Sequence, residues 1–119
     1  IGHFAMKIRE IAELLDASVL NCSEKLDREI EFAFATDLMS DVLTVSNENL
    51  LLITGLVNVQ TIRTAEMLDI ECILYVRNKT VPAEMIELAT EKEIVLLEHH
   101  RSMFNTCAAL YNAGVKPVF

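Results

Sequence analysis

Three short apolar segments recur at equal intervals along the chain, and this spacing constrains the fold more than any other feature. The segments LLLITG, CILYVR and IVLLEH begin at Leu50, Cys72 and Ile94, with a constant step of 22 residues. Runs this apolar are typical of strands buried on both faces, and the residues between them suffice for a crossover helix. The spacing therefore predicts consecutive βαβ units with three parallel strands.

Helical patterns fill the segments between and after these predicted strands. Apolar residues recur about every three positions over residues 59–68, behind Asn58, which is suited to an N-cap. A second helix is predicted after Pro82, and a third ends at Gly114. In this last helix we expect one apolar side, which would face the core: Met103, Phe104, Cys107, Ala108 and Tyr111.

The first half of the chain is less regular. An amphipathic helix is predicted from Ile8 to Leu15, followed by two short strands in SVLNC and EIEFAFA. A further helix of modest length, DLMSDVLTVS, would start with Asp37 as its N-cap. The predicted fold is therefore α/β, a layered sandwich with a mostly parallel sheet of about five strands, whose order the sequence leaves open.

Chain length limits the number of domains. At 119 residues we expect one domain, over residues 6–119, with Met6 as the natural start and residues 1–5 as a remnant of cloning. No apolar run approaches the roughly 18 residues of a membrane span, and no secretion signal is evident. The expectation is a protein that does not enter membranes.

Charge and cysteine usage narrow the class of partner. The net charge of −8 repels phosphate backbones and anionic lipid headgroups, so neither nucleic acid nor a membrane surface is an expected partner. Cys22, Cys72 and Cys107 form no C-x-x-C motif, and three cysteines cannot all pair within one chain. We therefore expect reduced thiols and a cytoplasmic location.

The loops that follow the predicted strands hold the first candidate site. Neither the dinucleotide fingerprint nor the phosphate loop with its lysine occurs. In open α/β sheets, however, ligands lie beyond the carboxyl ends of the strands, where Thr54, Gly55, Asn58 and Arg77 would gather, followed by Asn78 and Lys79. The alternative is that these residues serve only as turn, cap and solvated loop.

The segment DLMSD holds the second candidate site. Asp37 and Asp41 are four residues apart and would share a helical face with Ser40 beside them, so the three could ligate a cation or a small ligand. The alternative is structural, because Asp37 already serves as the predicted cap. Two carboxylates leave most of a cation's coordination to water, so we predict no metal and no cofactor.

The segment EHHRSMFNTC is the third candidate. His99 and His100 are adjacent and would point in opposite directions at a strand end, which is poor metal geometry. A Cys107 nucleophile paired with a histidine would lack an oxyanion donor. We therefore expect these histidines to be exposed loop residues and the chain to have no catalytic residues.

Several of these segments resemble the DRTGG domain family. The likeness covers about residues 35–115 and is most specific in DLMSDVL, in TGL with the following Asn58, and in IRTAEMLDI. The five-residue signature that names the family is absent. The family is related to the N-terminal domain of HPr kinase/phosphorylase and, more distantly, to that of muramyl ligases, and it also occurs within phosphotransacetylases and beside CBS domains in regulated pyrophosphatases.

The resemblance implies a layered α/β domain, like the HPr kinase N-terminal domain, that accompanies catalytic domains without performing catalysis. We therefore expect a homodimeric regulatory or assembly module that senses a small anionic or nucleotide ligand. The alternative is a ligand-free interaction subunit that tethers or modulates a larger metabolic enzyme. A small enzyme that uses Asp41 or Cys107 has the least support.

Overall fold

The computed structural model describes residues 4–119, which form a six-stranded sheet in the order β2-β7-β6-β5-β4-β8. Its four central strands are parallel: β4 (Phe32–Ala35), β5 (Leu50–Thr54), β6 (Cys72–Tyr75) and β7 (Val95–Glu98). Ile73 of β6 lies between Leu52 of β5 and Leu96 of β7. The predicted α/β fold with three adjacent parallel strands is confirmed.

Two-residue strands close both edges of the sheet. The strand β2 (Ser18–Val19) is antiparallel to β7, and β8 (Lys116–Pro117) is parallel to β4. A separate ribbon pairs β1 (Met6–Lys7) with β3 (Glu29–Ile30), and the 3-10 turn η1 (Ser23–Lys25) precedes β3. The predicted strand EIEFAFA is thus divided into β3 and β4. The strand β8 was not predicted, because its sequence has no strand pattern.

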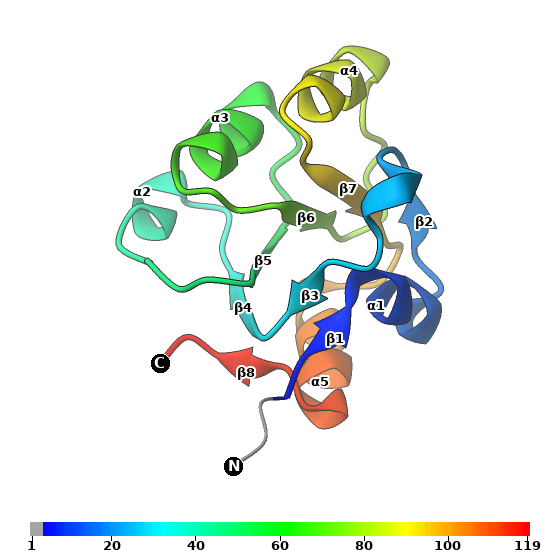
Figure 1. Cartoon of the computed structure of the whole chain (residues 1–119), viewed down its shortest axis with the longest axis vertical. Coiled ribbons are helices and arrows are strands. Elements are labelled where there is room, and N and C mark those ends of the chain that lie inside the picture. The colour runs from blue at the N-terminus through cyan, green and yellow to red at the C-terminus, as the bar shows by residue number, and fades with distance from the viewer. Residues whose placement is uncertain (1–3) are drawn as a thin grey trace.

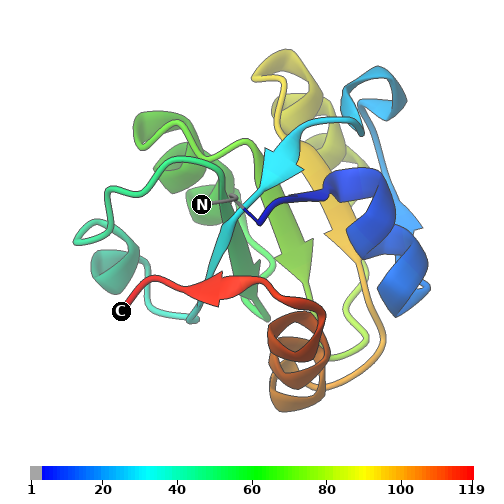
Figure 2. The same ribbon diagram turned by 60° about the horizontal axis from the view of Figure 1, so that its bottom comes forward.

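The helices form two layers, one on each face of the sheet (Figure 1). One layer contains α2 (Met39–Val42), α3 (Val59–Met67) and α4 (Ala83–Glu91), and the other contains α1 (Ile8–Leu15) and α5 (Met103–Ala113), as the turned view also shows (Figure 2). The chain visits β4, β5, β6 and β7 in spatial order, so right-handed crossovers place their connecting helices on the same face. The α5 helix then returns the chain across the opposite face to β8.

Alternate residues of the central strands fill two separate cores. Leu51 and Ile53 of β5 pack in the core beneath α1 and α5, whereas Leu50 and Leu52 pack in the core beneath α2, α3 and α4. All five residues of β5 are buried. Burial on both faces explains why this segment reads as a continuous apolar run and not as an alternating one.

The α5 helix turns a different side to the core than the sequence predicted. Phe104 is 85% exposed and Tyr111 is 68% exposed, whereas Thr106 and Leu110 are buried. Thr106 tolerates burial because its hydroxyl donates to the Ser102 carbonyl at 2.8 Å. The predicted inward face was therefore wrong for Phe104, Ala108 and Tyr111, whereas Met103 and Cys107 do pack against the core. A buried threonine is indistinguishable from a surface residue in the sequence pattern.

The start of the described chain packs against the end of α5. Residues 1–3 of the predicted cloning remnant lie outside the described residues. The Phe4 ring packs against Gly114, the left-handed C-cap of α5, so closely that an added Cβ would come within 2.8 Å of it. Among residues 4–119, no helix is long and apolar enough to cross a membrane.

Candidate functional site

Four side-chain and backbone groups converge at the carboxyl ends of β4, β5 and β6. The Asp37 Oδ1 atom accepts hydrogen bonds from the Gly55 amide at 2.7 Å and from the Thr54 hydroxyl at 3.0 Å. Asp37 Oδ2 lies 3.0 Å from Nη2 of Arg77. We call these four residues the carboxyl-edge cluster.

The local backbone explains why Asp37 reaches this edge. The Thr36 amide donates to the Ile53 carbonyl, which extends the β4–β5 ladder by one residue, and the Thr36 hydroxyl accepts from the Leu38 amide at 3.0 Å. The chain therefore turns between Thr36 and Leu38 and projects Asp37 toward the end of β5. The predicted cap was wrong: α2 begins at Met39, and Asp37 lies outside the helix.

Arg77 reaches the cluster from a strained loop. Arg77 and Asn78 have φ angles of 69° and 58°, in the left-handed region that residues with a Cβ rarely adopt. Their amides donate to the carbonyls of Arg101 at 2.8 Å and His99 at 3.3 Å, in the segment that follows β7. These two hydrogen bonds hold the loop in place, and the guanidinium then lies directly over Gly55, where a Cβ would overlap it.

The cluster favours the ionised form of Asp37. Partial burial raises the pKa of Asp37, but the hydrogen bonds from Gly55, Arg77 and Thr54 and the charge of Arg77 outweigh it, so the pKa lies below its ordinary value. The Arg77 and Asp37 side chains are 44% and 40% exposed. The cluster thus combines two buried donors, Thr54 and Gly55, with an ion pair that is partly exposed to solvent.

The other predicted site residues lie around this cluster. Asn58 caps α3, where its side chain accepts from the Thr61 amide, as predicted. Ser40 and Asp41 are exposed on α2, and neither side chain belongs to the hydrogen bonds of the carboxyl-edge cluster. Because Asp37 precedes the helix, it does not share a helical face with Asp41, contrary to the prediction.

The structure separates the two histidines. His100 is exposed, but His99 is only 5% exposed, and its Nδ1 atom has no hydrogen-bond partner among the described residues. Burial lowers the pKa of His99, and the nearby charges of His100 and Arg101 lower it further. The prediction of exposed histidines was therefore wrong for His99. Within residues 4–119, no group of three His, Cys, Asp or Glu side chains could hold a metal ion.

The outward side of α5 borders an apolar hollow that the sequence analysis missed. Its volume is about 360 Å³, and no charged side chain lines it. The Cys107 thiol lies at this hollow, and burial raises its pKa, which disfavours the thiolate. The signal was present in the sequence as the apolar stripe of α5, which we had assigned to the core. The lining residues are Ala33, Ala35, Ile53, Phe104, Cys107, Ala108, Tyr111, Val115 and Pro117.

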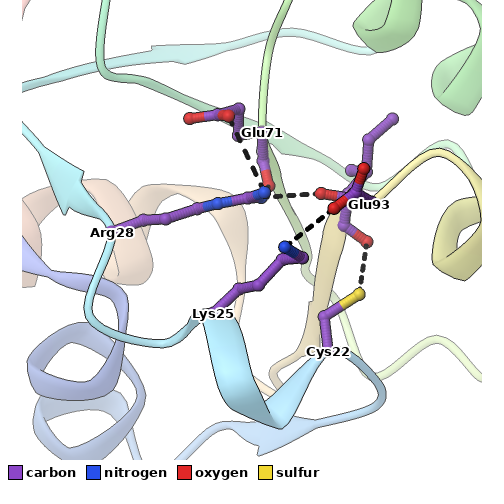
Figure 3. Close-up of polar contacts among 6 residues, drawn as sticks. Cys22, Lys25, Arg28, Glu71 and Glu93 are labelled. Atoms are coloured by element: carbon purple, nitrogen blue, oxygen red, sulfur yellow. Dashed lines mark hydrogen bonds and ion pairs between the residues drawn. The ribbon is translucent and has the colours of Figure 1, made fainter.

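A second charged cluster lies at the opposite, amino ends of the strands (Figure 3). Arg28 Nη1 donates to the backbone carbonyls of Glu93 at 2.6 Å and Glu71 at 3.2 Å, and Arg28 Nη2 lies 3.7 Å from the Glu71 carboxylate. Lys25 Nζ lies 2.8 Å from the Glu93 carboxylate, and the Cys22 thiol approaches the Ile94 carbonyl. We call Lys25, Arg28, Glu71 and Glu93 the amino-edge cluster.

Comparison with known proteins finds a matching family model and a similar solved structure. The family model for the DRTGG domain matches residues 10–113. A similar solved structure is that of the CBS and DRTGG domains of the regulatory region of a Clostridium perfringens pyrophosphatase, complexed with the activator diadenosine tetraphosphate. It superimposes with a TM-score of 0.73 at 17% identity, covering 94% of this chain and 48% of that one. No curated protein matches.

Proposed function

Because this chain belongs to the DRTGG domain family, we propose that it is a non-catalytic regulatory module, formed by residues 6–119, that binds a small anionic or nucleotide ligand at the carboxyl-edge cluster. The observation that carries this proposal is the convergence of the Gly55 amide, the Thr54 hydroxyl and the Arg77 guanidinium on one anionic group. Charge-assisted bonds of this kind are the strong ones in anion recognition. Ser40 and Asp41, exposed just beyond Asp37, are proposed contacts for the remainder of the ligand.

The regulated pyrophosphatase supports the choice of ligand class. Its regulatory region contains a DRTGG domain and was solved with a dinucleotide activator, which carries several phosphates. For this chain, a nucleotide with a terminal or bridging phosphate is the proposed ligand. The anionic group would take the donors of the cluster, and the nucleoside would extend over α2.

Thermal unfolding with diadenosine tetraphosphate and ATP tests the proposal. A ligand at 100 times its Kd adds about 2.7 kcal/mol, which for a chain of this size raises Tm by about 10 °C. Arg77→Ala should abolish the shift, whereas Arg63→Ala, which removes an exposed arginine of the same charge from α3, should retain it. An unchanged Tm with every nucleotide would contradict ligand sensing.

A second candidate function, interaction with a protein, is favoured by the hollow beside α5. Copies of a chain with a net charge of −8 repel one another, and an uncharged surface avoids placing like charges in contact; no charged residue lines this hollow. Phe104 and Tyr111 are exposed at its border, and aromatic residues are typical anchors of interfaces. We propose that two copies associate through this face as a twofold dimer.

Light scattering of the purified chain tests self-association. We expect a dimer that Phe104→Glu converts to monomers, while Met67→Glu, at a residue of α3 that is 70% exposed, leaves the mass unchanged. A monomeric wild-type chain would contradict the dimer. The alternative, a subunit that tethers a larger enzyme, requires a complex that withstands substitution of Asn58 and Arg77.

A further inference from the structure

The donors of the carboxyl-edge cluster already hold a negative charge that belongs to the protein itself. One carboxylate oxygen of Asp37 accepts hydrogen bonds from the Gly55 amide and the Thr54 hydroxyl, and the other oxygen pairs with Arg77. These are the groups that an incoming oxyanion needs, so a ligand can take them only when the carboxylate of Asp37 leaves. We propose that Asp37 is an intramolecular competitor that closes the anion site in the free protein and exchanges with a phosphate group of the ligand.

The chemistry of the two anions makes such an exchange feasible. Two oxygens of one phosphate group can accept from the same three donors as the two oxygens of a carboxylate, and a phosphate brings the larger negative charge. The Asp37–Arg77 pair is 40% and 44% exposed, and pairs this exposed contribute little to stability. The carboxylate is therefore held strongly enough to occupy the site and weakly enough to be displaced.

The element that follows Asp37 in the chain is short. Asp37 lies between β4 and α2, and α2 is a single turn of four residues whose N-cap, Leu38, makes no side-chain capping bond. Displacement of Asp37 would shift α2, whose N-cap Leu38 and C-cap Leu43 are 58% and 51% exposed. Occupancy of the site would thereby change an apolar surface, which is the output that a regulatory module needs.

The inference rests on the proposed anion site and is tested by titration with inorganic pyrophosphate at constant ionic strength. Asp37→Asn keeps the shape of the side chain, but its neutral amide cannot form an ion pair with Arg77 and is a weaker acceptor than the carboxylate. We expect it to bind pyrophosphate about tenfold more tightly than the wild type, because the competing closed state is lost. Asp69→Asn makes the same change of charge at the amino ends of the strands, at a left-handed residue that asparagine tolerates, and should leave the affinity unchanged.

Nuclear magnetic resonance of the wild type supplies an independent readout. Pyrophosphate should move the Asp37 carboxyl resonance toward that of a solvated aspartate and shift the Gly55 amide. Binding without movement of the Asp37 resonance, or equal affinities in the wild type and Asp37→Asn, would overturn the exchange while leaving the anion site intact. Absence of pyrophosphate binding in both proteins would overturn the anion site itself.

Discussion

The two edges of the parallel sheet each gather an arginine and carboxylates, yet they differ in what the arginine contacts. Arg28 at the amino edge is 20% exposed and donates to two backbone carbonyls that precede β6 and β7. Arg77 at the carboxyl edge is 44% exposed, and its contacts are a carboxylate and a glycine. Backbone carbonyls cannot leave, whereas a carboxylate on a turn can.

This difference separates a structural clamp from a binding site. The amino-edge cluster joins the turn of η1 to the beginnings of two strands, so its bonds contribute to stability. The carboxyl-edge cluster joins three loops beyond the ends of the strands, where ligands of open α/β sheets bind. An arginine pairs with a carboxylate at each edge, and the two arginines differ in their exposure and in the backbone carbonyls that only Arg28 contacts.

The largest effect on stability is expected at the amino edge. Arg28→Met keeps the aliphatic part of the side chain but deprives the Glu71 and Glu93 carbonyls of a donor, which should lower the free energy of unfolding by about 2 kcal/mol. Urea denaturation measures the loss. The control Lys92→Met removes only a surface ion pair with Glu66 and should cost less than about 0.5 kcal/mol. Equal losses of unfolding free energy in the two variants would contradict the inference that Arg28 stabilises the fold more than a surface ion pair does.

A smaller effect is expected from Gly55→Ala at the carboxyl edge. The added methyl group would overlap the Arg77 guanidinium, the mobile end of a long side chain, so we expect the pair with Asp37 to break at a cost of about 1 kcal/mol or less. In an Arg77→Ala background the methyl group has room, and the same substitution should be neutral or stabilising. If Gly55→Ala still lowers the free energy of unfolding in the Arg77→Ala background, a clash with Arg77 is not the cause.

The smallest effect is the pH dependence of stability, which is expected from a histidine at the carboxyl edge and not from the amino-edge cluster. The pKa of His99 is lowered, chiefly by burial, so the unfolded chain takes up a proton first, and stability should fall as the pH drops below about 6.5. At the amino edge the pKa of Lys25 is raised and that of Glu93 is lowered by their mutual hydrogen bond, away from this range. His99→Leu should flatten the dependence between pH 7 and 5.5 in urea denaturation, whereas His100→Gln should not. An unaltered slope in His99→Leu would exclude this histidine as its source.

The central strands could be predicted because strands that are buried on both faces consist almost entirely of apolar residues. Leu50, Cys72 and Ile94 open runs that are apolar on both faces, and their short length together with the helical patterns between them favours strands over buried helices. Helix ends were equally legible at Asn58 and Gly114, because cap chemistry is local. The grouping of Thr54, Gly55 and Arg77 followed from the rule that parallel strands end at one edge.

The predictions that were wrong concern side chains with two local uses. The local pattern predicts Asp37 as a helix cap, but the Gly55 amide, 18 residues away in the chain, donates to the same carboxylate. On α5 the hydropathy pattern predicts that Phe104 is buried and that Thr106 is exposed. The structure shows the reverse, because a hydropathy pattern does not reveal that the Thr106 hydroxyl donates within its own helix. The burial of His99 is a different case, because its Nδ1 atom has no hydrogen-bond partner among residues 4–119.

By itself, the sequence determined that this chain builds parallel βα units, since alternation of buried strands and amphipathic helices is a property of neighbouring residues. Only the tertiary structure decided the strand order, the two-residue edges, the outward face of α5 and the partner of Asp37. Each of these depends on which segments of the chain lie side by side in the folded protein. Contacts between distant segments, and not local preference, select among competing hydrogen-bond partners and surfaces.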